Sequence, residues 1–215
     1  MTAHLPPRLK TIVFDMAGVL LTWQPRRMLM RELPHLATDE ARAAHWELEI
    51  FQNYGGDWGD FDRGTVGVPE LVQRIAHRTG LAAVDVKTVV DAVPRELQPI
   101  ADSLALLQRL AAAGHALHYL SNMPAPFADL LESRHAFFRR FHSGVFSARV
   151  HHNKPEAAVY HLAADRFGAA PADLVFLDDT LVNVTAARAL AWNALHFSTA
   201  TQAAADLRAQ GWVAD

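Results

Sequence analysis

Short apolar runs recur along the chain, and polar residues directly follow several of them. The run at residues 12–14 ends in Asp15, and comparable runs lie at 115–120, 144–147, 174–177 and 194–197. Runs of this length are typical of strands buried on both faces, as the strands of a parallel sheet are. Between these runs, apolar residues recur at helical spacing. Strands that alternate with helices predict an α/β fold, with a parallel sheet between two layers of helices.

The predicted helices fall into two groups. Those of the first group alternate with the strands, at residues 99–113, 125–139, 155–167, 183–191 and 200–209. The second group fills residues 24–97, where Thr38 can cap a helix that Gly55 and Gly56 end, and where further helices are predicted at 69–78 and 84–93. We therefore predict a core formed by residues 1–23 and 98–215. An α-helical cap formed by residues 24–97 would cover the carboxyl edge of the first strand and exclude water there.

The composition fits an enzyme or binding protein with a packed interior. Of the 215 residues 51% are hydrophobic, and 20 basic against 23 acidic residues give a formal net charge of −3. This charge offers no field that would recruit a nucleic acid or an anionic membrane. Without cysteine there is no disulfide or thiolate metal site. The apolar runs are shorter than the ~20 residues that cross a bilayer, and no long apolar segment begins the chain, so we expect a cytoplasmic protein.

Carboxylates follow two of the predicted strands. Asp15 ends the first strand, and Asp178 and Asp179 end the run at 174–177. Because the carboxyl ends of parallel strands meet at the edge where ligands bind, these acids are expected to lie close together. Adjacent acids repel each other unless a cation neutralises them, and hard oxygen ligands favour Mg²⁺. Asp15 could also act as a covalent nucleophile, and the alternative is that it caps the following turn.

A hydroxyl, an amide and an ammonium group stand at two further positions after predicted strands. Ser121 and Asn122 follow the run at 115–120, and Lys154 precedes the helix-starting Pro155. A hydroxyl and an amide can hydrogen-bond a phosphate oxygen, and a compact ammonium group suits a phosphate. The alternatives are a helix cap for the Ser-Asn pair and a solvated surface position for the lysine.

In chain order, these groups resemble the four motifs of the haloacid dehalogenase superfamily, and with the cap they span nearly the whole chain. The motifs are the stretch from Asp15 to Gly18, then Ser121-Asn122, Lys154-Pro155 and Asp178-Asp179. The resemblance implies a Rossmann-like three-layer core, hydrolysis of a small phosphorylated metabolite, and Mg²⁺ as cofactor. It also implies catalytic roles for Asp15, Ser121 and Lys154, phosphate binding by Ser121, Asn122 and Lys154, and a metal held by Asp15, Asp178, Asp179 and the carbonyl oxygen of Ala17.

Ala17 departs from the usual phosphatase motif, in which a second aspartate supplies the general acid and base. A positioned general acid is typically worth about 10² to 10⁴ in rate, and its loss matters least when the leaving oxygen is acidic. The first motif is also similar to that of bacterial sugar phosphatases of the glucose-1-phosphate type. Because an anomeric hydroxyl is more acidic than an ordinary alcohol, we predict a sugar 1-phosphate as a candidate substrate.

Three other functions stay open. A binding or regulatory protein could keep the pocket and lose turnover. A phosphonatase would share Ala17 but would need a cap lysine, and Lys87 is the only lysine of the insertion. A 2-haloacid dehalogenase is disfavoured, because those enzymes usually lack a double acid in the fourth motif. Side chains that could reach a substrate or a proton are Trp23, His45, Trp46, Tyr54, Trp58, His151 and His152.

Overall fold

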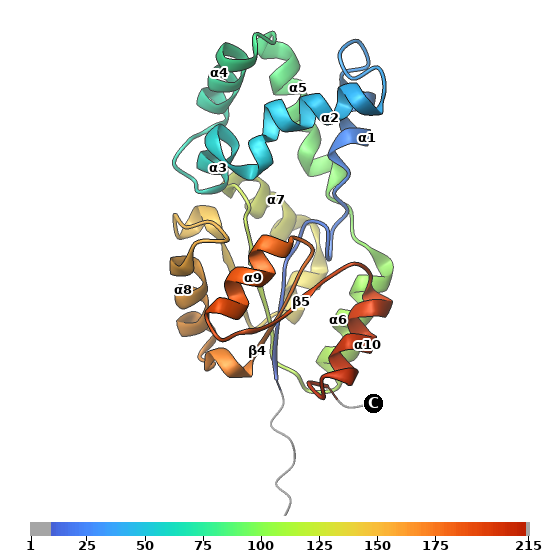
Figure 1. The fold of residues 1–215 in the computed structure, drawn as a ribbon, viewed down its shortest axis with the longest axis vertical. Helices are drawn as coiled ribbons and strands as arrows, with labels where there is room; N and C mark the ends of the chain where they lie inside the picture. Colours follow the sequence, from blue (N-terminus) through green and yellow to red (C-terminus); the bar gives the residue numbers. More distant parts are fainter. Residues whose placement is uncertain (1–9, 214–215) are drawn as a thin grey trace, which may run out of the picture.

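A parallel sheet lies at the centre of the molecule, whose computed structural model describes residues 10–213 (Figure 1). Its strand order is β3-β2-β1-β4-β5, and every neighbouring pair is parallel. The strands are β1 (Thr11–Phe14), β2 (Leu117–Ser121), β3 (Ser143–Phe146), β4 (Leu174–Asp178) and β5 (Asn193–His196). The predicted α/β fold with a Rossmann-like parallel-sheet core is therefore confirmed.

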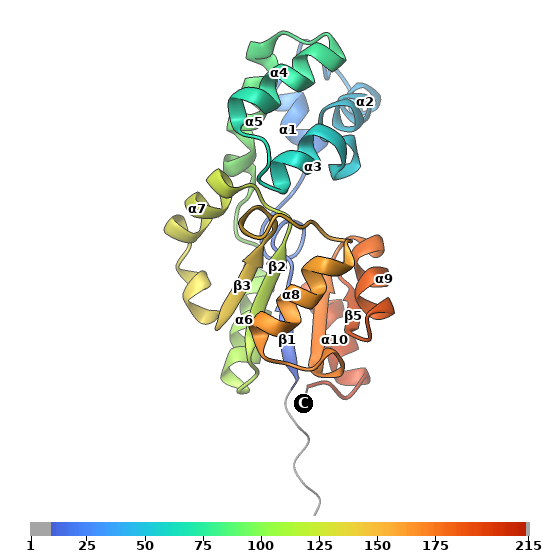
Figure 2. The same cartoon turned by 90° about the vertical axis from the view of Figure 1, so that its left-hand side faces the viewer.

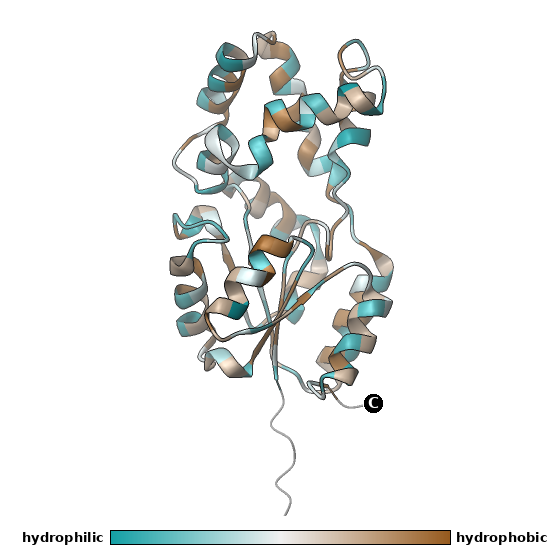
Figure 3. Ribbon diagram, in the orientation of Figure 1, coloured by the Kyte–Doolittle hydropathy of each residue, from teal (hydrophilic) through white to brown (hydrophobic). Residues whose placement is uncertain are grey.

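Helices cover both faces of this sheet (Figure 2). On one face, Val13 and Phe176 pack against residues of α8 (Ala157–Phe167) and α9 (Leu181–Ala189). On the other, Ile12 and Phe14 share a core with α6 (Ala101–Ala112), α7 (Ala125–Arg134) and α10 (Ala200–Ala209). Successive side chains of a strand point to opposite faces, so a strand covered on both sides is largely apolar. Figure 3 shows hydrophobic segments in the strands at the centre, and helices around them in which hydrophobic and hydrophilic residues alternate.

Five helices lie together beyond the carboxyl edge of the sheet (Figure 1). They are α1 (Pro25–Glu32), α2 (Glu40–Phe51), α3 (Gly56–Asp62), α4 (Val68–Thr79) and α5 (Ala83–Glu96). Their arrangement supports the division that we propose, with a cap at 24–97 and a core at 1–23 and 98–215. Residues 1–9, on which the expectation of no N-terminal signal depends, lie outside the described residues. Within the described range, no helix is long and apolar enough to cross a membrane.

Several predicted helix ends were wrong. The cap of α2 is Asp39 and not Thr38, because the Asp39 carboxylate accepts from the backbone N–H of Arg42 at 2.8 Å. This helix already ends at Phe51, and Gly56 begins α3, which the sequence pattern did not predict. Helix α6 starts at Ala101 because Pro99 instead forms a β-bridge with Leu21.

The cap is docked on the core at α3. The rings of Phe61 in α3 and Phe127 in α7 pack edge to face with their centroids 5.5 Å apart. Asn153, in the loop before α8, donates to the carbonyl oxygen of Gly59 at 2.7 Å. Arg63, directly after α3, pairs with Glu156 of the same core loop. Aromatic, polar and charged contacts thus hold the end of α3 against the core.

Candidate active site

Asp15 stands at the carboxyl end of β1, as predicted. Its backbone N–H donates to Leu177 O of β4 at 2.9 Å, and its Oδ1 accepts from the Met16 N–H at 2.7 Å. The loop then turns through Gly18, whose φ is +80°. A Cβ at Gly18 would lie 2.1 Å from Oδ2 of Asp179, which is far inside contact distance. Glycine is therefore favoured here, both by the positive φ and by the close approach of the Asp179 side chain.

Lys154 joins the first and fourth motifs. Its Nζ lies 2.9 Å from Oδ2 of Asp15 and 2.7 Å from Oδ2 of Asp178, and the lysine is only 5% exposed. Burial acts to lower the pKa of the ammonium group, but Asp15 and Asp178 outweigh it and hold that pKa above its usual range. The lysine is therefore a fixed positive charge beside the nucleophile candidate, and the bland alternative of a solvated surface lysine is wrong.

The acid pair after β4 has two different environments. Asp178 is fully buried, and its carboxylate accepts from the Thr180 N–H at 2.8 Å and from Asn183 Nδ2 at 3.1 Å. Asp179 is the more accessible of the two. Asn183 of α9 thus orients the Asp178 carboxylate.

Asp15, Asp178 and Asp179 form an oxygen-rich cluster in which one carboxylate oxygen of each lies within 4.8 Å of the others. Burial raises the pKa of Asp15 to about 7; Lys154 lowers it, and Asp178 and Asp179 raise it further. The pKa of Asp179 is raised by burial and then by Asp178. Three carboxylates against one ammonium group leave an excess of negative charge, which a divalent cation would neutralise. The residues therefore fit a hard cation such as Mg²⁺.

Ser121 and Asn122 lie at the end of β2, beside these groups. The Asn122 side chain accepts from the backbone N–H of Lys154 at 2.8 Å and donates to its carbonyl oxygen at 3.0 Å. Both ends of the amide therefore hold the lysine backbone in place. Ser121 is buried, and among the described residues its side chain makes only a long contact of 3.5 Å to Asn122 O, which leaves its hydroxyl free to turn toward a ligand.

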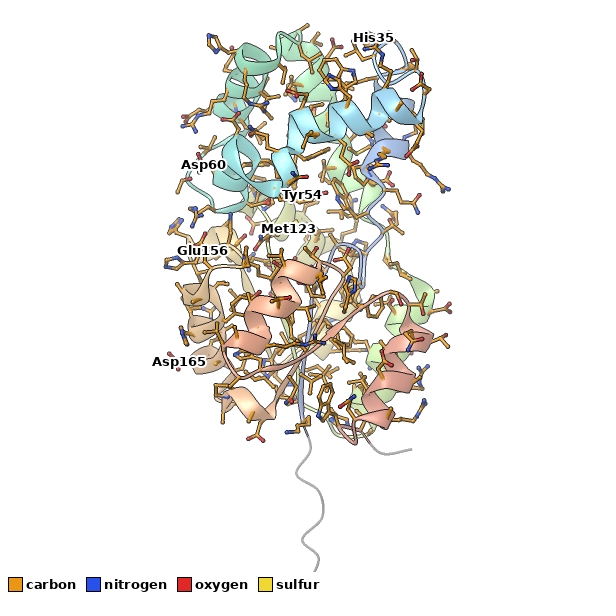
Figure 4. The ribbon with its side chains drawn as sticks, viewed as in Figure 1. His35, Tyr54, Asp60, Met123, Glu156 and Asp165 are labelled. Carbon is orange, nitrogen blue, oxygen red and sulfur yellow. The ribbon has the colours of Figure 1, made fainter. Side chains whose placement is uncertain are left out.

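A cavity of about 360 Å³ opens between the cap and these motifs. Of the residues predicted for catalysis, phosphate binding and the metal, only the fully buried Asp178 does not line it, and much of the remaining wall is apolar. The large apolar and aromatic side chains of that wall include Trp23, Tyr54, Trp58, Leu97, Met123 and Phe127. Figure 4 shows Tyr54 and Met123 where the cap meets the core. The Trp23 Nε1–H donates to the Tyr54 hydroxyl oxygen at 2.7 Å, which ties the hinge of the cap to this wall.

Some candidates lie elsewhere. His45 and Trp46 do not line the cavity, and their rings pack on each other with centroids 4.9 Å apart. His151 and His152 are also absent from the wall and contact Arg63 O and Glu156 respectively.

The sequence pattern missed Asp62, which lies at the end of α3 and lines the cavity. It is 4% exposed, and burial raises the pKa of its carboxyl group to about 8, with Lys154 lowering it and Asp15 raising it. The signal that could have found it is the buried pair Trp58 and Phe61, which stand three residues apart and mark a helix directly before this acid. The three glycines at 55, 56 and 59 concealed that helix.

A capped parallel sheet that gathers an aspartate, a lysine and an acid pair at one edge defines a hydrolase of the haloacid dehalogenase class. The haloacid dehalogenase-like hydrolase family model matches residues 9–191, and the chain belongs to that family.

The chain is similar to several known proteins over most of its length. It is 26% identical over 203 residues to the sesquiterpene phosphatase astK of Aspergillus oryzae, across 93% of this chain and 95% of that protein. It is 24% identical over 191 residues to the drimenol cyclase drtB of Aspergillus calidoustus, across 87% of this chain but 34% of the cyclase. The family enzyme BT-2542 of Bacteroides thetaiotaomicron, in complex with magnesium and inorganic phosphate, has a TM-score of 0.69 at 20% identity over 89% of this chain and 95% of that one. The last similarity shows a shared fold.

Proposed function

We propose that this hydrolase is a Mg²⁺-dependent phosphatase that hydrolyses small phosphomonoesters through an aspartyl phosphate. The observation that carries the proposal is the contact of Asp15 with the buried ammonium of Lys154, beside the acid pair and under a capped cavity. The phosphatase among its relatives and the magnesium and phosphate in the similar structure support it.

The chain's own residues have distinct parts in this reaction. A carboxylate oxygen of Asp15 attacks phosphorus, and the bond from phosphorus to the leaving oxygen breaks. The Lys154 ammonium and the Ser121 hydroxyl stabilise the charge on the transferring phosphoryl oxygens. Asn122 positions Lys154 through its two backbone hydrogen bonds. Water then attacks the aspartyl phosphate, which releases phosphate and restores Asp15.

The acid cluster is the proposed cation site. Asp15, Asp178, Asp179 and the carbonyl oxygen of Ala17 would hold Mg²⁺, which when bound neutralises charge on the phosphoryl oxygens.

The wall of the cavity favours an apolar organic group on the phosphate. Each sugar hydroxyl that leaves water needs a hydrogen-bond partner, or its burial costs free energy. The side chains Trp58, Leu97, Met123 and Phe127 offer an apolar surface in place of such partners. The names of the two fungal relatives also support a terpenoid or similar hydrocarbon monophosphate. The sugar 1-phosphate predicted from the first motif remains the competing substrate class.

A phosphonatase finds little support in the cap. The Lys87 ammonium is paired with Asp91 at 2.6 Å, its side chain is 58% exposed, and it does not line the cavity.

The partner that the proposed function implies is a small phosphorylated molecule. A cytoplasmic location without nucleic-acid partners remains a prediction from the sequence.

The test is release of inorganic phosphate from three substrates, with Mg²⁺ and with a chelator. A prenyl or terpenyl monophosphate, a sugar 1-phosphate and p-nitrophenyl phosphate separate the substrate classes, and we expect the first to have a higher kcat/KM than the sugar. Asp15→Asn should abolish turnover, because the amide is nearly isosteric but a poor nucleophile. Asp60→Asn is the matched control, since the Asp60 side chain is half-exposed on the cap and pairs with Arg74. Undiminished turnover in Asp15→Asn, or no turnover of any ester by the parent, would overturn the proposal.

A further inference from the structure

The proposed mechanism lacks a proton donor at its usual place. Ala17 lines the cavity where the common motif carries a second aspartate, and a methyl group cannot protonate the leaving oxygen. An alkoxide is a poor leaving group, so hydrolysis of an alkyl or terpenyl phosphate needs an acid from elsewhere.

The cap brings one additional carboxyl group into this cavity. Asp62 is buried, lines the same cavity as Asp15 and Asp179, and is close enough to Asp15 and Lys154 for their charges to act on it. Its side chain has no hydrogen bond or ion pair with any residue that the structure describes. A buried carboxyl group without a partner is costly, and such groups persist where a ligand or a reaction uses them.

Core residues fix the position of this carboxyl group. The Ser147 hydroxyl donates to the backbone carbonyl oxygen of Asp62, and the same Ser147 oxygen accepts from the Met123 N–H at 2.9 Å. Met123 directly follows Ser121 and Asn122, so one side chain connects the second motif to the end of α3. The loop before Lys154 provides the second attachment, from Asn153 to Gly59. Asp62 is thereby placed relative to the phosphate-binding groups by the loops that carry them.

The other titratable groups of the wall either have another role or are too weakly acidic to donate this proton. Lys154 pairs with two carboxylates, and Asp179 belongs to the proposed cation site. The Tyr54 hydroxyl oxygen accepts from Trp23, and burial raises the pKa of that phenol to about 12.

We propose that Asp62 is the proton donor for the leaving oxygen, taking the role that Ala17 cannot fill. This inference rests on the proposed phosphatase function. As Asp15 forms its bond to phosphorus, the bond from phosphorus to the leaving oxygen breaks, and the Asp62 proton moves to that oxygen, so the alcohol departs neutral. The resulting Asp62 carboxylate then takes a proton from the water that attacks the aspartyl phosphate. The bond from phosphorus to Asp15 breaks, phosphate leaves, and both aspartates regain their starting states.

The surroundings of Asp62 favour the protonated form that this role requires. Burial raises its pKa to about 8, Lys154 lowers it, and Asp15 raises it. The other charged or titratable groups nearby are Asp179 and Tyr54 on the wall, and the Arg63–Glu156 pair with His151 beside the helix end. A bound cation would lower this pKa, and the phosphate dianion of a substrate would raise it.

The test compares Asp62→Asn with the parent over aryl and alkyl phosphates whose leaving groups differ in acidity. We expect kcat/KM for alkyl phosphates to fall by about 10² to 10⁴, with a much smaller loss on p-nitrophenyl phosphate, whose leaving group needs no acid. The dependence of rate on leaving-group acidity should therefore be shallow in the parent and steep in the variant. Asp60→Asn, in the same helix, should leave both series unchanged.

A structural role for Asp62 would lower both series equally, and that result, or undiminished alkyl turnover, would overturn the inference. The parent alone supplies a second measurement that needs no variant. Its kcat/KM for an alkyl phosphate should fall on the alkaline side, as Asp62 loses its proton, at a lower pH than that for p-nitrophenyl phosphate. Coincident pH profiles would also overturn the inference. Because p-nitrophenyl phosphate turnover and its dependence on Asp15 test the phosphatase function separately, the two failures are distinguishable.

Discussion

Replacing Asp62 by asparagine should stabilise the protein at neutral pH while it damages turnover. The Asp62 carboxyl group is 4% exposed and has a pKa raised by burial from 3.8 to about 8. In the unfolded chain this group ionises near its ordinary pKa, whereas in the folded protein it stays protonated until about pH 8. Between these two pH values the unfolded state binds fewer protons, so the free energy of unfolding falls as pH rises. An asparagine has no such dependence.

The size of the effect follows from the two pKa values. Each unit of pH between these values lowers the free energy of unfolding of the parent by about 1.4 kcal/mol, so by pH 7 it has fallen by about 4 kcal/mol. For a chain of this length, 1 kcal/mol corresponds to roughly 2–4 °C in Tm. The difference in Tm between Asp62→Asn and the parent should therefore be roughly 10 °C larger at pH 7 than at pH 4. Any pH-independent effect of burying an amide shifts both differences equally and cancels.

Thermal unfolding followed by circular dichroism over about pH 4 to 9, in chelator, provides the assay. The chelator removes stabilisation by bound cations, which would otherwise add a concentration-dependent contribution. Asp60→Asn is again the control, because exposed ion pairs contribute about 0–1 kcal/mol and its Tm should follow the parent at every pH. A difference between Asp62→Asn and the parent that stays constant with pH would refute a raised pKa for Asp62.

Two further predictions concern the metal site. Chelation should abolish phosphate release. Asp179→Ala should weaken Mg²⁺ binding measured by calorimetry, because the variant removes the most accessible carboxylate of the cluster. Full activity in chelator would contradict the Mg²⁺ requirement and would call for a halide-release assay on 2-haloacids. Gly18→Ala should raise the Mg²⁺ concentration needed for half-maximal activity while far-UV circular dichroism stays unchanged. The new Cβ would lie 2.1 Å from Oδ2 of Asp179, so this carboxylate would have to move. Unchanged Mg²⁺ dependence would show that the loop accommodates the methyl group.

The parts of the fold that sequence predicts are those that local patterns determine. Strands β1 and β4 are buried on both faces, so every residue from Ile12 to Phe14 and from Leu174 to Leu177 is apolar, whatever packs on them. The carboxyl ends of parallel strands share one edge, and Asp15, Ser121 and Asp178 accordingly come from the ends of three neighbouring strands. Chain order and strand geometry alone therefore indicate the core of the site.

The parts that sequence does not predict depend on contacts between distant segments. Phosphate binding by Asn122 stays a prediction, but its hydrogen bonds to the backbone of Lys154, 32 residues away, could not be predicted, because only the folded chain brings the two residues together. Helix α3 has a glycine-rich sequence with weak helical propensity, and the burial of Trp58 and Phe61 against other elements stabilises it. Asp62 depends on this helix, so the same tertiary contacts that conceal the helix from sequence analysis also conceal the acid.

Placing the proton donor on the cap would couple the chemistry to cap closure. An acid in the first motif remains beside the nucleophile whether or not the cap is docked. Asp62 lies in the cavity with Ser147 and Asn153 holding the end of α3 against the core, and it would leave the cavity if those contacts were broken. Leaving-group protonation and exclusion of water would therefore begin together, when the cap closes over a bound substrate. A poor leaving group needs that proton, whereas an aryl phosphate does not, so this arrangement makes alkyl phosphate turnover more sensitive to cap docking than aryl phosphate turnover.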